Sequence, residues 1–178
     1  ASLWQYVDID VATDLYTGIM TDTGGLSYNS NDPDIYLVMA ELLRCGINKP
    51  EIHDNLFNSK TMRRMHLTGY ALGKKLRRIE KYPIAIITLD KNELLKYHYV
   101  TGDTEGLVNM ALQIKDVLVS AFIMGRPDGV KISLRSKQDF PVNEFLAEHF
   151  AGGGHLNAAG ANFVGPIDDA VNRFTENI

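Results

Sequence analysis

The residues best suited to chemistry are three consecutive glycines and a histidine, Gly152, Gly153, Gly154 and His155. A glycine in a regular element costs about 0.5–1 kcal/mol relative to alanine, so a specific need for bare backbone is expected here. Bare backbone permits positive φ angles, or it lets successive N–H groups approach the negative oxygens of a ligand. The imidazole of His155 can donate to the same oxygens. The plain alternative is a helix C-cap and a turn beside an exposed histidine.

A guanidinium group, Arg135, ends a stretch with a two-residue period. Apolar and polar side chains alternate over residues 130–135, which is typical of a half-buried strand. Arginine binds phosphate or carboxylate through paired N–H groups, and Ser133 and Ser136 flank it with hydroxyl groups. The small residues 158–161 follow the glycines and leave room beside them. Together these features favour a site for an oxyanion.

Two motifs in this order resemble a known superfamily. Arg135 within residues 132–136, followed by residues 152–155 and 158–160, is similar to the DHH-associated C-terminal domain of the DHH phosphoesterases. Residues 16–26 resemble the fourth metal-binding motif of the N-terminal catalytic domain of that superfamily. The nearest subgroup is the bacterial oligoribonuclease and 3'-phosphoadenosine-5'-phosphate phosphatase type, often called exopolyphosphatase-related. The resemblance extends over nearly the whole chain.

The resemblance implies roles for the residues at matching positions. Asp22 would be a manganese ligand. The substrate phosphate would be bound by Arg135, Gly152, Gly153, Gly154 and His155, with Ser133 and Ser136 as weaker candidates. Enzymes of this family use two Mn²⁺ ions to activate a bridging hydroxide that attacks phosphorus. The parent protein would hydrolyse short oligoribonucleotides or nucleoside phosphates.

The sequence departs from the family at the metal site. None of its five histidines follows an aspartate, so the Asp-His-Asp and Asp-His-His motifs are absent. One carboxylate cannot hold two divalent ions, because each ion needs several ligands. We therefore expect this chain alone to be inactive and to form the substrate-binding portion of the parent enzyme. The alternatives are a non-catalytic nucleic-acid or nucleotide-binding module, as in alanyl-tRNA synthetase-like proteins, and a scaffold in which the glycines only turn the chain.

Composition narrows the class of protein further. The 178 residues are 45% hydrophobic and 22% charged, which excludes disordered and collagen-like chains. A net charge of -4 argues against a general nucleic-acid coat, and the longest apolar run is too short for a membrane span. A lone cysteine, Cys45, cannot form an internal disulfide, so a cytoplasmic location is expected. A start at Ala1 without Met suggests the cut end of a longer chain.

The elements that must position these residues follow from periodicity and capping signals. Helices are expected over residues 11–20, 33–45, 49–57, 59–82, 103–114, 142–150 and 167–174. Asp10, Asp32, Ser59 and Asp103 are the expected N-caps of four of them, although Asp103 is an equally good candidate for a substrate contact. Strands are expected over residues 84–89, 117–124 and 130–135, the last two joined in an antiparallel hairpin by the turn at 125–129.

The predicted fold class is α/β, with a mixed β-sheet in the C-terminal part and helices before it. Residues 1–58 would be the helical C-terminal part of a DHH domain, and residues 83–178 the substrate-binding domain. Residues 59–82 would be a connector helix with eight basic residues and one acid, most simply a solvated face. Without the strands of a catalytic domain, the apolar faces in residues 11–57 would be left bare, which makes a homodimer or a domain swap plausible.

Overall fold

The computed structural model describes residues 3–178 and divides the chain into two compact units, Ala1–Lys60 and Thr61–Ile178. Ala1 and Ser2 lie outside the described residues. The segment expected to connect two domains, residues 59–82, is divided between the units, because Ser59 and Lys60 belong to the first and residues 61–82 to the second. None of the helices in residues 3–178 is long and apolar enough to cross a membrane.

The first unit is helical. Its elements are η1 (Leu3–Tyr6), α1 (Ile9–Asp22), α2 (Pro33–Arg44) and α3 (Lys49–Phe57). Asp32 caps α2 as expected, but α1 is capped by Asp8, whose carboxylate accepts from the Val11 N–H at 2.9 Å, and not by Asp10. A small core centred on Tyr16 and Leu42 holds the unit together. Large apolar side chains stay exposed on α1 and α2, and self-association through them remains a prediction.

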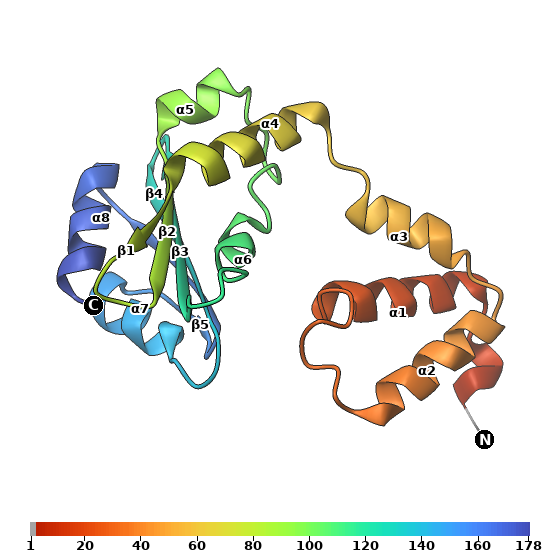
Figure 1. Cartoon of the computed structure of the whole chain (residues 1–178). Coiled ribbons are helices and arrows are strands. Elements are labelled where there is room, and N and C mark those ends of the chain that lie inside the picture. The colour runs from red at the N-terminus through yellow and green to blue at the C-terminus, as the bar shows by residue number, and fades with distance from the viewer. Residues whose placement is uncertain (1–2) are drawn as a thin grey trace. The chain divides into compact units, whose positions relative to one another are not determined.

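The second unit contains one six-stranded mixed sheet, which confirms the predicted fold class (Figure 1). The strands are β1 (Leu76–Ile79), β2 (Ile84–Leu89), β3 (Val119–Arg126), β4 (Gly129–Ser136), β5 (Gly153–His155) and β6 (Ala158–Phe163). Their order across the sheet is β1-β2-β3-β4-β6-β5. Only β2 and β3 are parallel, and the β3–β4 hairpin is the expected one.

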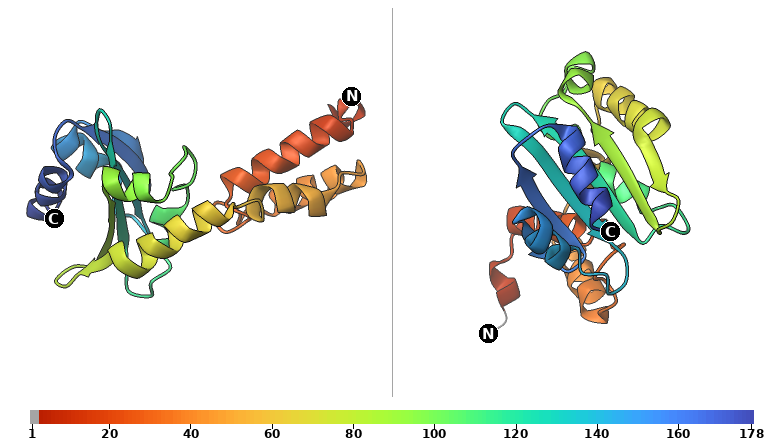
Figure 2. Two further views of the ribbon diagram at one scale, coloured as in Figure 1. Left: turned by 90° about the horizontal axis from the view of Figure 1, so that it is seen from above. Right: turned by 90° about the vertical axis from the view of Figure 1, so that its left-hand side faces the viewer.

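Helices cover the two faces of the sheet unequally. Helices α7 (Val142–Phe150) and α8 (Ile167–Glu176) lie across one face and bury a core around Ile132 and Leu146 (Figure 2). On the other face, α4 (Met62–Tyr70) and α6 (Leu107–Ala111) cover β2 and β3, with α5 (Lys91–Lys96) following the end of β2. The second core, around Leu67 and Phe122, lies under this cover. The outer strands β6 and β5 are thus backed by α7 on one face only.

The long helix predicted from Ser59 to Pro83 is wrong in its second half. Helix α4 is capped by Thr61, a π turn (Ala71–Lys75) follows it, and residues 76–79 form β1. Leu72, Leu76 and Ile79 have helical spacing, but the last two lie in a strand that pairs antiparallel with β2. This pairing outweighs local helix propensity because it hydrogen-bonds β1 along its length to a buried strand.

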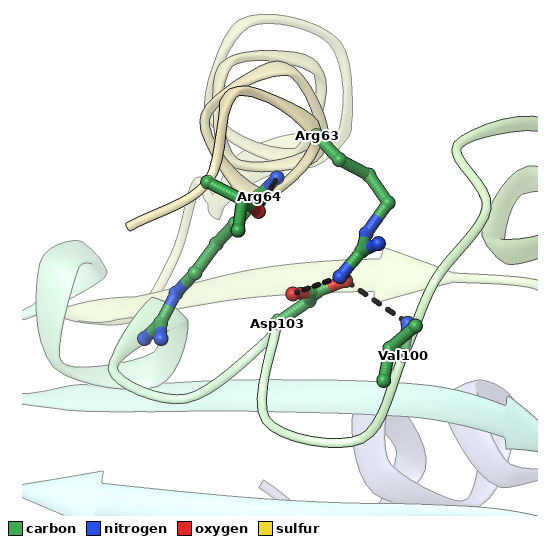
Figure 3. Close-up of polar contacts among 5 residues, drawn as sticks. Arg63, Arg64, Val100 and Asp103 are labelled. Carbon is green, nitrogen blue, oxygen red and sulfur yellow. Dashed lines mark hydrogen bonds and ion pairs between the residues drawn. The ribbon is translucent and has the colours of Figure 1, made fainter. Parts of the chain in front are cut away.

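The N-cap role predicted for Asp103 is also wrong. Helix α6 begins after Gly106, which has a left-handed conformation at φ +86°. The buried Asp103 carboxylate accepts hydrogen bonds from Arg63 Nε at 2.9 Å and from the Val100 N–H at 2.9 Å (Figure 3). These bonds attach α4 to the loop before α6, and the Arg63 guanidinium lowers the pKa of the Asp103 carboxyl.

We predict that Asp103→Ala lowers the free energy of unfolding at pH 7 by about 1–2 kcal/mol, because Arg63 and Val100 lose a charged acceptor. Since the folded pKa of Asp103 is lowered, the pair stabilises the fold above the ordinary aspartate pKa, near 3.9, and this contribution is lost as the pH falls through the lowered value. Urea unfolding at several pH values measures both effects. The control is Glu105→Ala, an exposed side chain in the same loop. An equal loss in both variants would contradict the role of the pair.

Candidate functional site

Strand β4 separates two kinds of side chain between the two faces of the sheet. Val130, Ile132 and Leu134 are buried in the core under α7 and α8. Because side chains alternate along a strand, Lys131, Ser133 and Arg135 lie on the other face, and each of them is half-buried. The alternation predicted from the sequence is confirmed, and it directs Arg135 away from the α7–α8 core.

The pairing of β4, β6 and β5 brings several predicted site residues together. Ala158 is paired with Arg135 on one side and with His155 on the other, and Gly160 is paired with Ser133 and Gly153 in the same way. Paired residues of neighbouring strands share a face of the sheet. These six residues, here called the exposed strip, therefore form two adjacent rows on one face. With strands about 4.8 Å apart, the Cα atoms of Arg135 and His155 lie about 10 Å apart.

The residues in the middle of the exposed strip have small side chains that project little from the sheet. On β6, the middle strand of the three, only the Ala158 methyl group lies between Arg135 and His155, and Gly160 places only a hydrogen between Ser133 and Gly153. Gly153, His155 and Gly160 are exposed. A flat ligand can therefore lie on β6 backbone with a guanidinium on one side and an imidazole on the other.

Arg135 is the principal cation of the strip. Its Nη1 donates to the carbonyl of Leu134 at 2.8 Å, and within residues 3–178 its side chain forms no ion pair with a carboxylate. Burial lowers the pKa of this guanidinium, because its charge is partly removed from water. An anion bound beside it would offset that unfavourable desolvation.

The structural reason for a glycine differs among the three positions. A Cβ at Gly152 would lie 2.6 Å from Ala161 Cβ, and one at Gly154, where φ is +144°, would lie 2.5 Å from the Ala158 carbonyl oxygen. Both glycines are thus required by close packing against β6. Gly153 has neither a positive φ angle nor an atom within 4 Å of an added Cβ. Its bare backbone is the one that internal packing leaves unexplained.

The glycine run also differs from the expected anion-binding turn. Residues 153–155 form the short strand β5 at the edge of the sheet, paired with β6. An edge strand has N–H and C=O groups on its outer side that no neighbouring strand uses. Ligand contact with the glycines would therefore occur along an extended backbone and not in a nest of successive N–H groups.

Ser136 lies apart from the exposed strip. It is buried on the opposite face of β4, donates its hydroxyl to the Phe140 carbonyl at 2.7 Å and accepts from Asn157 Nδ2 at 2.9 Å. Asn157 also donates to the Gln138 carbonyl at 2.7 Å. This network fixes the turn between β5 and β6 against the end of β4. Asn157 was not among the predicted site residues, although an asparagine in a short turn after His155 was a usable signal.

Asp22 is in the first unit, as the exposed last residue of α1. Within the described residues there is no group of three or more His, Cys, Asp or Glu side chains that could hold a metal ion. Two manganese ions require more oxygen or nitrogen ligands than one aspartate offers. The residues present therefore do not fit a dinuclear metal centre.

Comparisons with known proteins agree with these features. The family model described as "DHHA1 domain" matches residues 82–178, which include the whole exposed strip. The bifunctional oligoribonuclease and PAP phosphatase NrnA of Thermus thermophilus is 30% identical over 94% of this chain and 49% of its own length. The probable protein of the same name from Streptococcus mutans is 30% identical over 83% of this chain and 46% of its own. The chain thus spans about half the length of these relatives.

A solved structure extends the similarity to both units of the chain. The crystal structure of an exopolyphosphatase-related protein from Bacteroides fragilis is 42% identical, with a TM-score of 0.94 over 98% of this chain and 51% of that protein. The resemblance to the DHH phosphoesterases noted from the motifs is confirmed. On the match to residues 82–178, the chain belongs to the DHHA1 domain family.

Proposed function

We propose that the exposed strip binds the phosphate and the adjoining nucleoside of a short oligoribonucleotide or nucleoside phosphate. In this proposal the chain is the substrate-binding portion of a manganese-dependent phosphoesterase. The observation that carries it is the register of β4, β6 and β5, which aligns Arg135 and His155 across a low floor of small residues. The printed names of the relatives, which are oligoribonucleases and PAP phosphatases, support the substrate class.

Each group of the strip has a distinct part in this binding. Arg135 donates paired N–H groups to two phosphate oxygens, and His155 donates a ring N–H from the other side. Ser133, in the row beside Arg135, offers a hydroxyl to the sugar or to a second phosphate. Gly153 lets the ligand approach the backbone of β5, because no side chain stands in the way. These contacts hold and orient the phosphorus for attack.

The cleavage step is assigned to no residue of this chain. When bound in the parent enzyme, two manganese ions would supply the activated hydroxide and stabilise the charge of the transition state. Asp22 would contribute one carboxylate to such a centre. The contribution of the exposed strip is positioning, in which contacts away from the metal hold the scissile phosphate in place.

Arg135 and His155 are the two side chains proposed to donate to the phosphate from opposite sides. Arg135→Gln and His155→Asn should each weaken the binding of the 5'-phosphorylated dinucleotide pApA by roughly tenfold or more, because a charge-assisted hydrogen bond contributes about 1.5–3 kcal/mol. Isothermal titration calorimetry of the full chain measures the affinity. The matched control is Arg78→Gln, an exposed arginine on the distant edge strand β1. If it weakens binding as much as Arg135→Gln does, the strip is not the binding site.

The second prediction separates the glycines. Gly153→Ala should leave the melting temperature nearly unchanged, since nothing lies within 4 Å of the added methyl group, yet weaken pApA binding several-fold. Gly154→Ala should destabilise the fold by roughly 1–3 kcal/mol, because its φ angle and the Ala158 carbonyl exclude a Cβ. Thermal unfolding and calorimetry on both variants test this pair. Unaltered pApA affinity in Gly153→Ala would refute the backbone contact.

The third prediction concerns catalysis. The chain as given should show no Mn²⁺-dependent hydrolysis of a short RNA, because one carboxylate cannot assemble a two-metal centre. The products of pApA incubated with the chain and millimolar Mn²⁺ can be separated by anion-exchange chromatography. Turnover that requires Mn²⁺ and is lost in Asp22→Asn would show that the chain completes a metal centre.

A further inference from the structure

A cavity of about 730 Å³ lies at the end of the second-unit sheet where β2 and β3 finish. Helix α5, the loop after it and the turn between β3 and β4 form its walls. In α/β sheets the carboxyl ends of parallel strands are the usual place for a ligand, and β2 and β3 are the parallel pair. Along β3, Arg126 in the cavity wall lies six positions after Ser120, which is paired with Arg135. Arg126 thus lies about 20 Å along the strand from the partner of Arg135, so the cations of the cavity are separate from those of the exposed strip, although Met124 in the cavity wall is only two residues from Phe122, the partner of Ser133.

The walls of the cavity carry positive charge. Lys91 and Arg126 both line it, together with His98, and its lining within the described chain includes no Asp or Glu. Lys91 Nζ donates only to the Pro127 carbonyl, at 3.3 Å. The Arg126 side chain forms neither an ion pair nor a hydrogen bond with any other group in residues 3–178. Two permanent cations therefore face the cavity without a carboxylate partner.

Nearby acids are occupied or lie elsewhere. Asp90 caps α5 by accepting from the Glu93 N–H, and Glu93 pairs with Lys75 and Tyr70 on the other side of the helix start. Asp128 is exposed in the β3–β4 turn and does not line the cavity. No carboxylate of residues 3–178 forms an ion pair with Lys91 or Arg126, so an anion from outside the chain can contact both cations directly.

The rest of the cavity wall is apolar. Leu94 and Met124 are buried in the second core and present one side to the cavity, while the Leu95 side chain at the rim is 72% exposed. Gly125 lets β3 pass close to α5, since a Cβ there would lie 3.3 Å from the backbone nitrogen of Lys91. A volume of this size is in the range of sites that enclose a nucleotide-sized molecule.

We propose that this cavity binds a small anion that carries a flat ring, either a nucleoside monophosphate or an aromatic carboxylate. The anionic group lies between Lys91 and Arg126, and the ring lies against Leu94, Leu95 and Met124. Both parts of the ligand contribute to binding. The cations attract its negative charge, and burial of the ring against the apolar wall removes apolar surface from water. This second site is independent of the one proposed on the exposed strip.

The test is an NMR titration of the full chain that follows the Met124 methyl resonance. The titration is repeated in the Arg135→Gln background, which weakens binding at the exposed strip, so a Met124 shift whose affinity is the same in both backgrounds belongs to the cavity. The probes are AMP, indole-3-acetate, adenosine and inorganic phosphate. The titration of the Met124 resonance gives the affinity of each probe. AMP or indole-3-acetate should bind at least tenfold more tightly than adenosine or phosphate does. Which of the two binds identifies the source of the anion.

Two variants make the result specific. Arg126→Gln should lower the affinity for the probe that binds by about tenfold or more, because it removes one of the two cations. Leu95→Glu, at an exposed position, should also lower this affinity, because it places a negative charge at the rim of the cavity. Arg78→Gln is the matched control and should leave the affinity unchanged. The proposal is overturned if neither ringed anion shifts Met124 at millimolar concentration, if adenosine or phosphate alone binds as tightly, or if Arg78→Gln weakens binding equally.

Discussion

The pairing of β6 between β4 and β5 is the constraint on which the candidate site depends. A slip of one residue in either ladder would move the paired side chains to opposite faces of the sheet, so Arg135 and His155 would no longer share one. Two glycines protect this register. Gly152 and Gly154 let β5 approach β6 so closely that any side chain would collide. The lack of a side chain at Gly152 and Gly154 therefore permits the close β5–β6 pairing on which the geometry of the strip depends.

The unequal covering of the sheet explains why the strip is accessible. Helices α7 and α8 bury one face, whereas on the other face α4 and α6 protect the region of β2 and β3. The bond of Arg63 to Asp103 attaches α4 to the loop before α6 and so stabilises that partial cover. The site is thus the part of the sheet face that the helices leave exposed.

The second unit offers positive charge at both ends of the β3–β4 hairpin. At one end, Arg135 is half-buried beside small residues and suits a phosphate on an open surface. At the other end, Lys91 and Arg126 line an apolar cavity. The same kind of cation therefore stands in two different settings, one flat and one concave, and the shape of each setting decides which ligand it can accept.

Elements with local signals could be predicted from the amino-acid sequence alone. Asp32 and Pro33 start α2, the alternation in β4 fixes which of its residues face the core, and the glycines with Arg135 and His155 stand out as candidates for anion binding. The other features depend on long-range contacts. Residues 76–79 form a strand because they pair with β2. Asp103 accepts a hydrogen bond from Arg63, forty positions earlier in the chain, and Ser136 lies on the buried face, where it accepts a hydrogen bond from Asn157. These outcomes depend on contacts between distant segments, and local propensity is too weak to predict such contacts.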